Sequence, residues 1–500
     1  MKRRELTRRH FLRLAGAAAA ASFIAPSYGY AKPLAISDSA RKDLAAKVSG
    51  GVLKPGDPGF AALARPQNLR YENIAPLGIA RPRDAAETIA AVAWARATGT
   101  PMVLRSGGHS YAGCSTLTGL IIHTGRMRDV RHVGNGIVEI AGGALNGDIY
   151  RALAGAKAEV GGDGLAATHG RCMGVGASGF LLGGGIGFAM RDRGLACDLV
   201  QEIEVALPDG EVVRASENEN ADLFWALRGG GGGNLGVALR FTLRAVPAEP
   251  MTSFKLSWQR KVEEVFFRLA RSLEGAPERM GSKLSVEATR KGSTHPNTVQ
   301  LIGQLRGQHD EMRAILAPAF EVAAPSTSSV QTTPYWQAQK FLSEEGPPAR
   351  YQETSRYCGA LDERVVEDVF RRVRAWPGTH ADAVFKMFHV GGRIRTVPAA
   401  ATAYVHRTAE WLTGTELNWT DADKPAVVQA NLAWQRDFHE ACTVLMPEGG
   451  SYQNFTDPGL ADPATAYYGA NLDRLREIKR RIDPDGIFSP PRRQGIDPAP

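Results

Sequence analysis

The spacing of apolar side chains predicts both helices and strands in the first part of the chain. Residues 84–98 carry apolar positions at helical spacing, and Asp84 stands where a helix N-cap is expected. Residues 146–156 show the same helical spacing. Short apolar runs that read as strands lie at 101–104, 120–123 and 137–141. Because these elements do not alternate as regular βαβ units, the pattern favours an α+β domain.

A hairpin and then a change of pattern mark the second part of the chain. Residues 201–207 and 211–215 are strand-like and flank the turn Pro208-Asp209-Gly210. Helical stretches are expected at 261–273, 308–320 and 472–482, and strands at 383–390 and 402–405. The change of pattern from about residue 251 predicts a second domain.

Glycine usage supports that division. Many of the 55 glycines lie between residues 161 and 236, whereas glycine is sparse after 251. From about 445 the chain again becomes rich in Gly, Tyr and Asn. Such clustering indicates backbone held close to a ligand, because glycine has no Cβ to block the approach.

The N-terminus reads as a targeting segment. Thr7-Arg8-Arg9-His10-Phe11-Leu12-Arg13 resembles a twin-arginine signal, which exports proteins already folded around a cofactor. An apolar stretch, 14–25, and the small-residue pattern Gly29-Tyr30-Ala31 follow it. This stretch is shorter than the roughly 20 residues that span a bilayer. We expect a signal peptide at 1–31, a periplasmic or secreted protein without stable membrane insertion, and the twin-arginine machinery as a partner of the precursor. A retained N-terminal anchor is the alternative.

Net charge does not point to a nucleic-acid partner. The chain carries +8, but residues 1–31 hold six basic residues against Glu5, a net of +5. The remaining charge of about +3 shows no basic run interleaved with aromatic residues. We therefore expect no nucleic-acid binding.

Cysteines and histidines give no sign of a metal site. The pairs His123/His132 and His389/His406 lack a helical ligand spacing and a carboxylate partner, so no metal is expected. The five cysteines are few and odd in number for an exported disulfide protein. One of them is therefore expected to be committed to other chemistry, and any pairing among the remaining four stays open.

Three glycine-rich loops predict a large phosphate-bearing cofactor. Gly174-Val-Gly176-Ala-Ser-Gly179 fits G-x-G-x-x-G, but it opens no βαβ unit and no acidic residue follows at a strand end. Gly107-Gly108 and Gly229–Gly233 supply two further loops. Their backbone N–H groups could line a diphosphate, which needs several close donors. Glycine used only for close packing is the alternative.

The same loops, with two C-terminal motifs, resemble a known family. The matching segments are Arg105-Ser-Gly-Gly-His109-Ser-Tyr111, Cys172-x-x-Val175-Gly176, Gly183-Gly-Gly185-x-Gly187, Asp222-Leu-Phe-Trp-Ala-Leu-Arg-Gly-Gly230, Tyr452-x-Asn454-Phe455-x-Asp457 and Tyr468-Gly-x-Asn471-x-x-Arg474-Leu475. In this order, from about 70 to 496, they resemble the FAD-linked oxidases of the berberine bridge enzyme type, within the vanillyl-alcohol oxidase superfamily.

The resemblance implies a fold and a division of the chain. It implies an α+β protein with a PCMH-type FAD-binding domain of two α/β subdomains, and a substrate domain whose antiparallel sheet is covered by helices. The FAD-binding domain would span 40–250, the substrate domain 251–444, and a berberine bridge-like segment, 445–496, would return to the FAD-binding domain.

The resemblance also implies FAD held by two covalent bonds, from His109 to the flavin 8α-methyl carbon and from Cys172 to C6. Many relatives lack the cysteine, and Met173-Gly174 follows it here. The other residues expected to contact the cofactor are Arg105, Ser106, Gly107, Gly108, Ser110, Val175, Gly176, Gly179, Gly183, Gly184, Gly187, Val237, Asn454 and Asn471.

The implied reaction is hydride transfer from a substrate C–H bond to flavin N5, while a base removes the adjacent O–H proton. Val175 lies where the family places its oxygen gate, and valine there goes with O₂ as acceptor and H₂O₂ as product. A dehydrogenase with another acceptor and a non-catalytic flavin-binding protein remain alternatives. Sugars, secondary alcohols and polycyclic or phenolic metabolites are all open as small-molecule substrates.

The resemblance does not identify the catalytic base in this chain. Many relatives carry tyrosine at the position of Phe455, which cannot accept a proton. Tyr111 and Tyr452 are the predicted catalytic phenols, although a strand at 452–455 would put Tyr452 on the opposite face from Phe455. Further polar side chains near the expected strand at 402–405 are His389, His406, Arg407 and Glu416.

Overall fold

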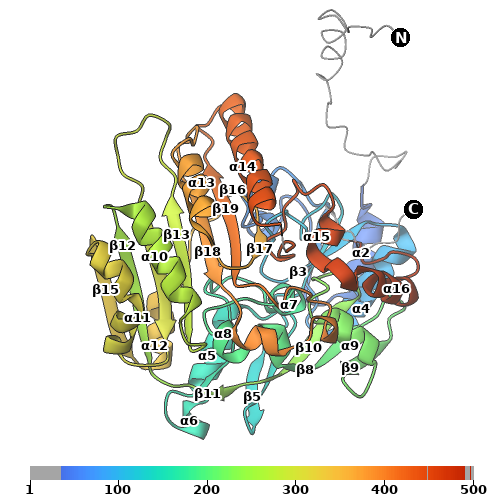
Figure 1. Cartoon of the computed structure of the whole chain (residues 1–500). Helices are drawn as coiled ribbons and strands as arrows, with labels where there is room; N and C mark the ends of the chain where they lie inside the picture. Colours follow the sequence, from blue (N-terminus) through green and yellow to red (C-terminus); the bar gives the residue numbers. More distant parts are fainter. Residues whose placement is uncertain (1–34, 448, 490–495, 497–500) are drawn as a thin grey trace, which may run out of the picture. The chain divides into compact units, whose positions relative to one another are not determined.

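The computed structural model describes residues 35–447, 449–489 and 496, and those from Ile36 onward belong to one compact unit (Figure 1). The predicted signal peptide at 1–31 lies outside the described residues. Within the described ranges, no helix combines the length and apolar character that crossing a bilayer requires.

A small sheet near the N-terminus presents the first glycine-rich loop. Its strands run in the order β1-β2-β4-β3, and β2, β4 and β3 are parallel. The bounds are β1 Val52–Leu53, β2 Gly78–Ala80, β3 Met102–Arg105 and β4 Leu120–His123. Helices α2 (Asp38–Lys47) and α4 (Ala85–Thr98) pack on this sheet through Leu44, Val92 and Trp94. Asp84 caps α4 as predicted, by accepting a hydrogen bond of 2.9 Å from the Glu87 N–H.

A second, antiparallel sheet carries the remaining loops. Its order is β5-β6-β10-β8-β9, and β8 and β9 form the predicted hairpin. The bounds are β5 Val130–Gly134, β6 Ile137–Ala141, β8 Val200–Ala206, β9 Val212–Ser216 and β10 Val237–Arg244. A two-stranded pair, β7 (Leu165–Ala166) with β11 (Val246–Pro247), lies outside it. The helices of this part are α5 Asn146–Gly155, α6 Lys157–Val160, α7 Ala177–Leu182, α8 Met190–Arg193 and α9 Ala221–Leu227, whereas α3 Phe60–Ala64 packs on the first sheet.

The third sheet is antiparallel, has eight strands, and is drawn entirely from residues after 250. Its path is β15-β12-β14-β13-β18-β19-β16, with β17 also paired to β19. The bounds are β12 Met251–Trp258, β13 Met280–Glu287, β14 Val299–Leu305, β15 Thr327–Thr333, β16 Arg350–Glu353, β17 Arg356–Cys358, β18 Ala383–His389 and β19 Trp411–Trp419. This confirms the predicted fold class, an antiparallel sheet with helices beside a mixed α/β part. The domain boundaries stay a prediction.

Helices cover one face of the large sheet (Figure 1). They are α10 Val262–Glu274, α11 His309–Val322, α13 Glu363–Val373 and α14 Pro425–Leu445, with α12 Tyr335–Leu342 near its far edge. Side chains alternate along each strand, so Leu284, Phe385 and Leu417 face this helical core. Their polar neighbours Lys283, Lys386 and Glu416 project to the other face, where the functional cavity lies.

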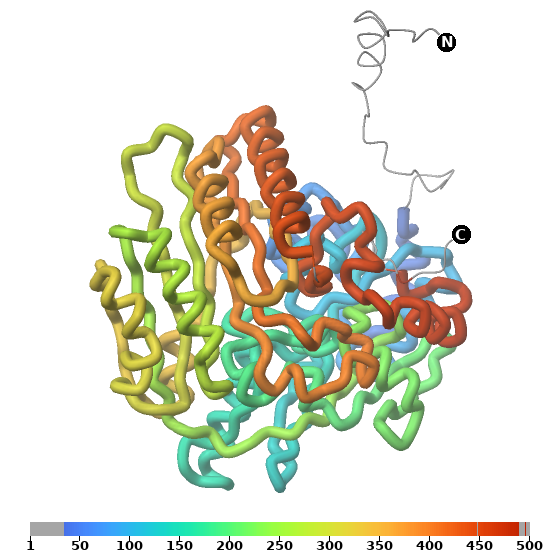
Figure 2. Tube along the Cα trace, viewed as in Figure 1, coloured from blue at the N-terminus to red at the C-terminus, as the bar shows by residue number. Residues whose placement is uncertain are grey.

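The C-terminal segment returns to the N-terminal part, as Figure 2 shows where the red end of the tube meets blue segments. It contains α15 (Pro463–Tyr468) and α16 (Leu472–Ile482). Phe488 packs in the core of the first sheet. The fully buried Lys479 donates to Asn234 O at 2.7 Å, to Asp483 Oδ2 at 2.6 Å and to Phe488 O at 2.6 Å.

Two sequence expectations about local structure are wrong. Residues 402–405 form no strand, because the N–H groups of Ala403 and Tyr404 bind the carbonyls of Trp225 and Arg228 at the end of α9. Residues 452–455 form a turn closed by the Phe455 N–H on Tyr452 O at 2.9 Å. The rings of Tyr452 and Phe455 therefore do not point to opposite faces. They meet edge to face, with their centroids 5.2 Å apart.

Candidate active site

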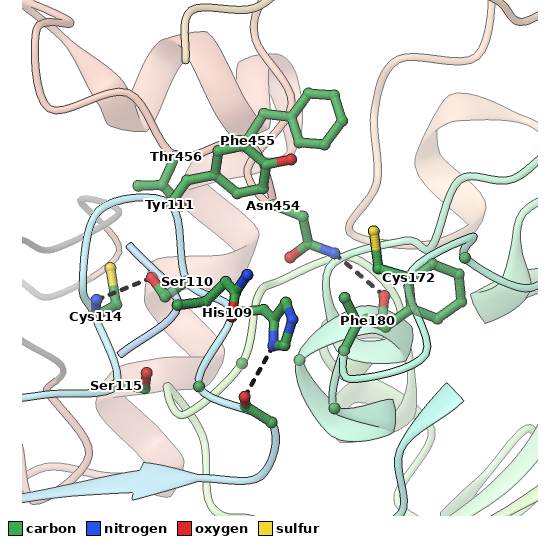
Figure 3. A pocket seen from close by; sticks show the side chains of 18 of the residues that line it. His109, Ser110, Tyr111, Cys114, Ser115, Cys172, Phe180, Asn454, Phe455 and Thr456 are labelled. Carbon is green, nitrogen blue, oxygen red and sulfur yellow. Dashed lines mark hydrogen bonds between the residues drawn. The ribbon is translucent and has the colours of Figure 1, made fainter. Parts of the chain in front are cut away.

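One cavity of about 1100 Å³ opens between the three sheets. Its walls come from loop 105–111, from the glycine-rich segment after Cys172, from the inner face of the large sheet and from the C-terminal segment. Figure 3 shows Tyr111, Asn454 and Phe455 gathered on one side of this space, with His109 and Cys172 also projecting toward it. The cavity is large enough for a dinucleotide together with a small substrate.

Loop 105–110 has the form of an anion cradle. The four successive N–H groups from Gly107 to Ser110 donate no hydrogen bond to any described residue. Gly108 has φ +72°, a left-handed conformation that turns the backbone. A Cβ at Gly107 would collide with backbone atoms of Gly174 and Gly176, so the two loops meet only because both lack side chains. Free N–H groups in such a turn bind phosphate oxygens.

Buried polar atoms along the same wall also lack partners among the described residues. Arg105 donates through Nε to Ser115 O at 2.9 Å and through Nη1 to Leu63 O at 2.6 Å, but its Nη2 meets no partner in the described ranges. Ser115 Oγ and Asn146 Oδ1 are likewise unpaired, and all three residues line the cavity. Burial lowers the pKa of Arg105 to about 10, so it is still cationic at neutral pH. These atoms fit a ligand with phosphate and hydroxyl groups.

His109 and Cys172 both line this cavity and are both uncharged. Burial lowers the pKa of His109 and raises the pKa of the Cys172 thiol. The imidazole is oriented by a 2.8 Å hydrogen bond between Nδ1 and Gly107 O, which Figure 3 marks. Since a carbonyl only accepts, Nδ1 carries the hydrogen in this arrangement.

Most of the predicted cofactor residues lie on the cavity wall. Those that line it are Arg105, Ser106, Gly107, Gly108, His109, Ser110, Cys172, Val175, Gly176, Gly179, Gly187, Val237 and Asn454. The structure does not bring Gly183, Gly184 or Asn471 to the wall. Gly183 leaves room for the Asn454 amide, and Gly184, with φ +119°, for Tyr404. Asn471 donates to Ala399 O at 2.8 Å and to Thr402 O at 3.0 Å.

The two predicted phenols occupy different environments. Tyr111 packs against Tyr351 and Phe455, with ring centroids 5.3 and 5.0 Å away. Burial, and then the nearby Glu353, raise the pKa of Tyr111 well above its usual value. The Tyr452 side chain is fully buried, and its hydroxyl accepts hydrogen bonds from the Gly185 N–H at 3.0 Å and Asn454 Nδ2 at 3.2 Å. Tyr452 is therefore placed to hold the glycine-rich loop, and its catalytic role stays a prediction.

Among the other polar candidates, only Glu416 reaches the cavity. Arg407 is 2% exposed and makes a bidentate pair with Asp198 at 2.7 and 2.8 Å. His406 bonds Tyr467 O at 3.0 Å, and His389 bonds Glu410 at 2.9 Å. Burial lowers the pKa of both histidines to about 4. These side chains hold loops in place and do not line the cavity.

Sequence reasoning named Glu416 but missed Lys386 and Glu353, with which it forms a charged group on the inner face of the large sheet. Lys386 on β18 lies 2.6 Å from Glu416 Oε2 on β19 and 2.9 Å from Glu353 Oε2 on β16. Tyr351, two residues before Glu353, also lines the cavity. Lys386 and Glu416 stand out as charged residues in largely apolar strands, but strand pairing was needed to show that they meet Glu353.

Comparison with known proteins agrees with this geometry. An FAD binding domain family matches residues 76–216, and a family described as berberine and berberine like matches 451–496. A xylooligosaccharide oxidase of Thermothelomyces thermophilus is 31% identical over 456 residues, 85% of this chain and 88% of the relative. An uncharacterized FAD-linked oxidoreductase of Bacillus subtilis is 29% identical over 457 residues, 88% of this chain and 96% of the relative.

The fold is also that of a solved relative. The xylooligosaccharide oxidase from Myceliophthora thermophila C1, in complex with xylobiose, superposes with a TM-score of 0.78 at 27% identity, covering 93% of this chain and all of that one. The cradle, the cavity and these similarities define a flavin-dependent oxidoreductase that uses FAD. The chain belongs to the berberine bridge enzyme-like family of FAD-linked oxidases.

Proposed function

We propose that this protein oxidises a hydroxyl-bearing carbon of a sugar or other small alcohol, with FAD attached covalently at both His109 and Cys172. The observation that carries the proposal is that these two side chains share one cavity with the unpaired N–H groups of residues 107–110. Support for a sugar comes from the similarity to xylooligosaccharide oxidases, and the polar inner face of the sheet suits hydroxyl-rich substrates.

Different loops of this chain would contact different parts of the cofactor. The N–H groups of 107–110 and the Arg105 guanidinium suit the diphosphate, while Val175, Gly179 and Val237 provide an apolar wall for flat rings. Two attachments would hold the ring without a closed pocket, which leaves the substrate side open. They would also withdraw electron density from the ring and so raise its reduction potential.

Bound FAD supplies hydride acceptance, and the protein supplies orientation and proton transfer. The large sheet contributes the substrate wall, with Tyr351 and Phe388 as apolar surfaces and Glu416 as a hydrogen-bond acceptor. Binding a substrate there would displace water from the C–H bond that breaks. Orientation of this kind accounts for a large share of catalysis in two-substrate reactions.

Oxygen is the proposed final electron acceptor, with hydrogen peroxide as the product. Val175 lines the cavity near the cofactor loops, and its small apolar side chain leaves space for a small apolar gas. The second candidate is a dehydrogenase that passes its electrons to another acceptor. Oxygen consumption and peroxide formation in equal amounts during turnover would distinguish the oxidase from the dehydrogenase.

Export through the twin-arginine pathway is proposed from residues 7–13 and the apolar stretch that follows. A periplasmic or secreted location would follow from it. This pathway suits a protein whose cavity must already contain its cofactor. Replacing Arg8 and Arg9 together by lysine should keep the flavoprotein in the cytoplasm, whereas correct export of that variant would contradict the proposal.

Intact mass of the acid-denatured protein tests the attachment directly. The wild type should carry one FAD, both His109→Ala and Cys172→Ala should still carry it through the remaining bond, and the double variant should release it. Anaerobic addition of xylobiose, and of other sugars and alcohols, should bleach the flavin absorbance. An unmodified mass with free FAD would refute the covalent bonds, and a flavin that no alcohol bleaches would indicate a non-catalytic flavin-binding protein.

A further inference from the structure

Three charged side chains meet on the inner face of the large sheet, and none of them has yet been given a part in proton transfer. The Lys386 ammonium lies between Glu416 and Glu353, at 2.6 and 2.9 Å from their Oε2 atoms. Strand β19 runs between β18 and β16, so pairing in one sheet fixes all three backbones. A charge cluster on rigid strands keeps its geometry better than one on loops.

The two carboxylates differ in their access to the cavity. The Glu416 side chain is 34% exposed and lines the cavity, whereas that of Glu353 is 1% exposed behind it. Glu416 also accepts a hydrogen bond from Asn418 Nδ2 at 3.1 Å. Both oxygens of Glu353 are buried and accept no hydrogen bond of good geometry from the described residues. Of these two carboxylates, only Glu416 can reach a substrate hydroxyl.

Glu416 and Glu353 differ in protonation state, because Lys386 and burial shift their pKa values in opposite directions. Lys386 lowers the pKa of Glu416 to about 2, against the effect of burial. Burial raises the pKa of Glu353 to about 8, in part opposed by Lys386. Although burial alone would lower the pKa of Lys386, the two glutamates raise it above its usual value. At neutral pH the cluster therefore holds an ionised Glu416, a charged Lys386 and a protonated Glu353.

The neighbouring phenols are poorer proton acceptors. Burial raises the pKa of Tyr351 and of Tyr111, and Glu353 and Glu416 raise both further. Phe388 and Phe455 complete this side of the wall and carry no acidic or basic group. Outside the cluster, Lys283 on β13 lowers the pKa of both glutamates, and Lys386 in turn lowers the pKa of the Cys172 thiol in part.

We propose that Glu416 accepts the proton of the substrate hydroxyl, and that Lys386 and Glu353 are positioning residues that hold this carboxylate and set its charge. The assignment rests on the proposed oxidation of an alcohol by the FAD-loaded protein. The substrate C–H bond breaks and its electron pair leaves as hydride to FAD. The O–H bond breaks and its proton goes to a Glu416 oxygen, while the carbon–oxygen bond becomes double.

A carboxylate of low pKa suffices for this step. As the hydride leaves, the hydroxyl becomes a protonated carbonyl, which is a far stronger acid than a carboxylic acid. Uptake of the proton also removes the negative charge of Glu416 that helps to keep Glu353 protonated. That change lowers the pKa of Glu353, while Lys386 remains between the two side chains.

The first test is anaerobic rapid mixing of the FAD-loaded protein with xylobiose, or with whichever sugar or alcohol bleaches the wild type fastest. Glu416→Gln should slow flavin reduction about a hundredfold or more, the size expected for a lost general base. The substrate concentration at half-maximal rate should change much less. Glu416→Asp should recover part of the rate, whereas Glu263→Gln, in an ion pair with Arg374 on the outer helices, should behave as wild type.

The second test follows pH. Above about pH 8 an ionised Glu353 adds negative charge beside Glu416, so the wild-type reduction rate should rise through this pH and the Glu353→Gln rate should not. Glu353 also binds its proton more tightly in the folded state. The free energy of unfolding should therefore fall between about pH 4.5 and 8 in the wild type, and fall less in Glu353→Gln. This second readout does not depend on turnover.

The outcomes separate the two proposals. A wild-type flavin that no sugar or alcohol bleaches would overturn the proposed function and this assignment with it. Rapid wild-type bleaching with an unchanged rate and pH profile in Glu416→Gln would overturn the assignment alone. Should Glu416→Gln fail to hold flavin, Glu416→Asp and Glu353→Gln decide, since wild-type rates and pH profiles in both would also overturn it.

Discussion

Phe388 and Phe455 pack with their ring centroids 5.7 Å apart on the substrate side of the cavity. Lys386 Nζ lies 5.9 and 5.5 Å from the centroids of these two rings. Phe455 stands where many relatives carry a phenol. The two phenylalanine rings make this part of the cavity wall apolar, and the charged Lys386 lies next to them. Phe455 cannot accept a proton, so the proposed proton transfer needs a group other than a phenol at this position.

Tyr452→Phe should affect the glycine-rich loop rather than proton transfer. The variant leaves the buried Gly185 N–H without its acceptor, which should cost about 1–2 kcal/mol of stability. The pH profile of anaerobic flavin reduction should keep its shape, because the hydroxyl is already engaged by two donors. Loss of the pH dependence in Tyr452→Phe would instead support Tyr452 as a catalytic phenol.

Gly176→Ala should impair flavin binding and folding together. A Cβ at this position would meet Ser106 and the Gly107 N–H, and so would separate the two loops of the cradle. We expect a loss of about 2 kcal/mol or more by thermal unfolding, with less bound flavin. Gly155→Ala is the matched control, since nothing lies within 4 Å of a Cβ at the end of α5. An equal, small effect of both substitutions would argue against the cradle.

Asp198→Asn should destabilise the protein without changing the cavity wall, which Asp198 does not line. Asp198 is the buried bidentate partner of Arg407, which also donates to Thr402 Oγ1 at 2.7 Å. Leaving Arg407 without its counter-charge should cost about 3 kcal/mol or more in urea unfolding. Asp222→Asn, at an exposed pair with Arg474, should change stability by about 0.5 kcal/mol or less.

Asp457→Asn should change how stability depends on pH. Burial raises the pKa of Asp457 from 3.8 to about 6, so the folded protein binds this proton more tightly than the unfolded chain. The wild type should therefore lose stability as pH rises from about 4 through 6, by about 3 kcal/mol from this group. The variant should show a shallower decline in its melting temperature over that range. Parallel curves for the two proteins would contradict the buried carboxyl group.

Local sequence signals predicted much of the fold. The helices at 84–98 and 472–482 and the hairpin at 201–215 appear where periodicity, caps and turn residues indicated. The strand expected at 402–405 is wrong because an apolar run there is buried against α9 instead of in a sheet. The turn at 452–455 was missed for a similar reason, since tertiary contacts of the two rings decide its shape.

In the candidate site, too, the sequence indicated the residues of contiguous motifs but not those that meet only through strand pairing. Most residues predicted to contact the cofactor line one cavity, because they belong to contiguous motifs such as loop 105–110. That they bind FAD stays a prediction. Glu353, Lys386 and Glu416 could not be grouped from the sequence, since they lie on separate strands and meet only through the register of β16, β18 and β19. Asn471 belongs to a recognised motif, yet its hydrogen bonds serve the backbone of 399–402.

The return of the C-terminal segment sets an order of events during synthesis. Asn454, Phe455 and Phe488 complete the cavity, and Lys479 ties α16 to the loop at Asn234. A ribosome-bound chain that lacks these residues has the glycine-rich loops but an open-sided cavity. We therefore expect stable capture of the cofactor to follow synthesis of the C-terminal segment. Truncation after residue 450 would remove the last wall of the cavity while leaving both proposed attachment residues in place.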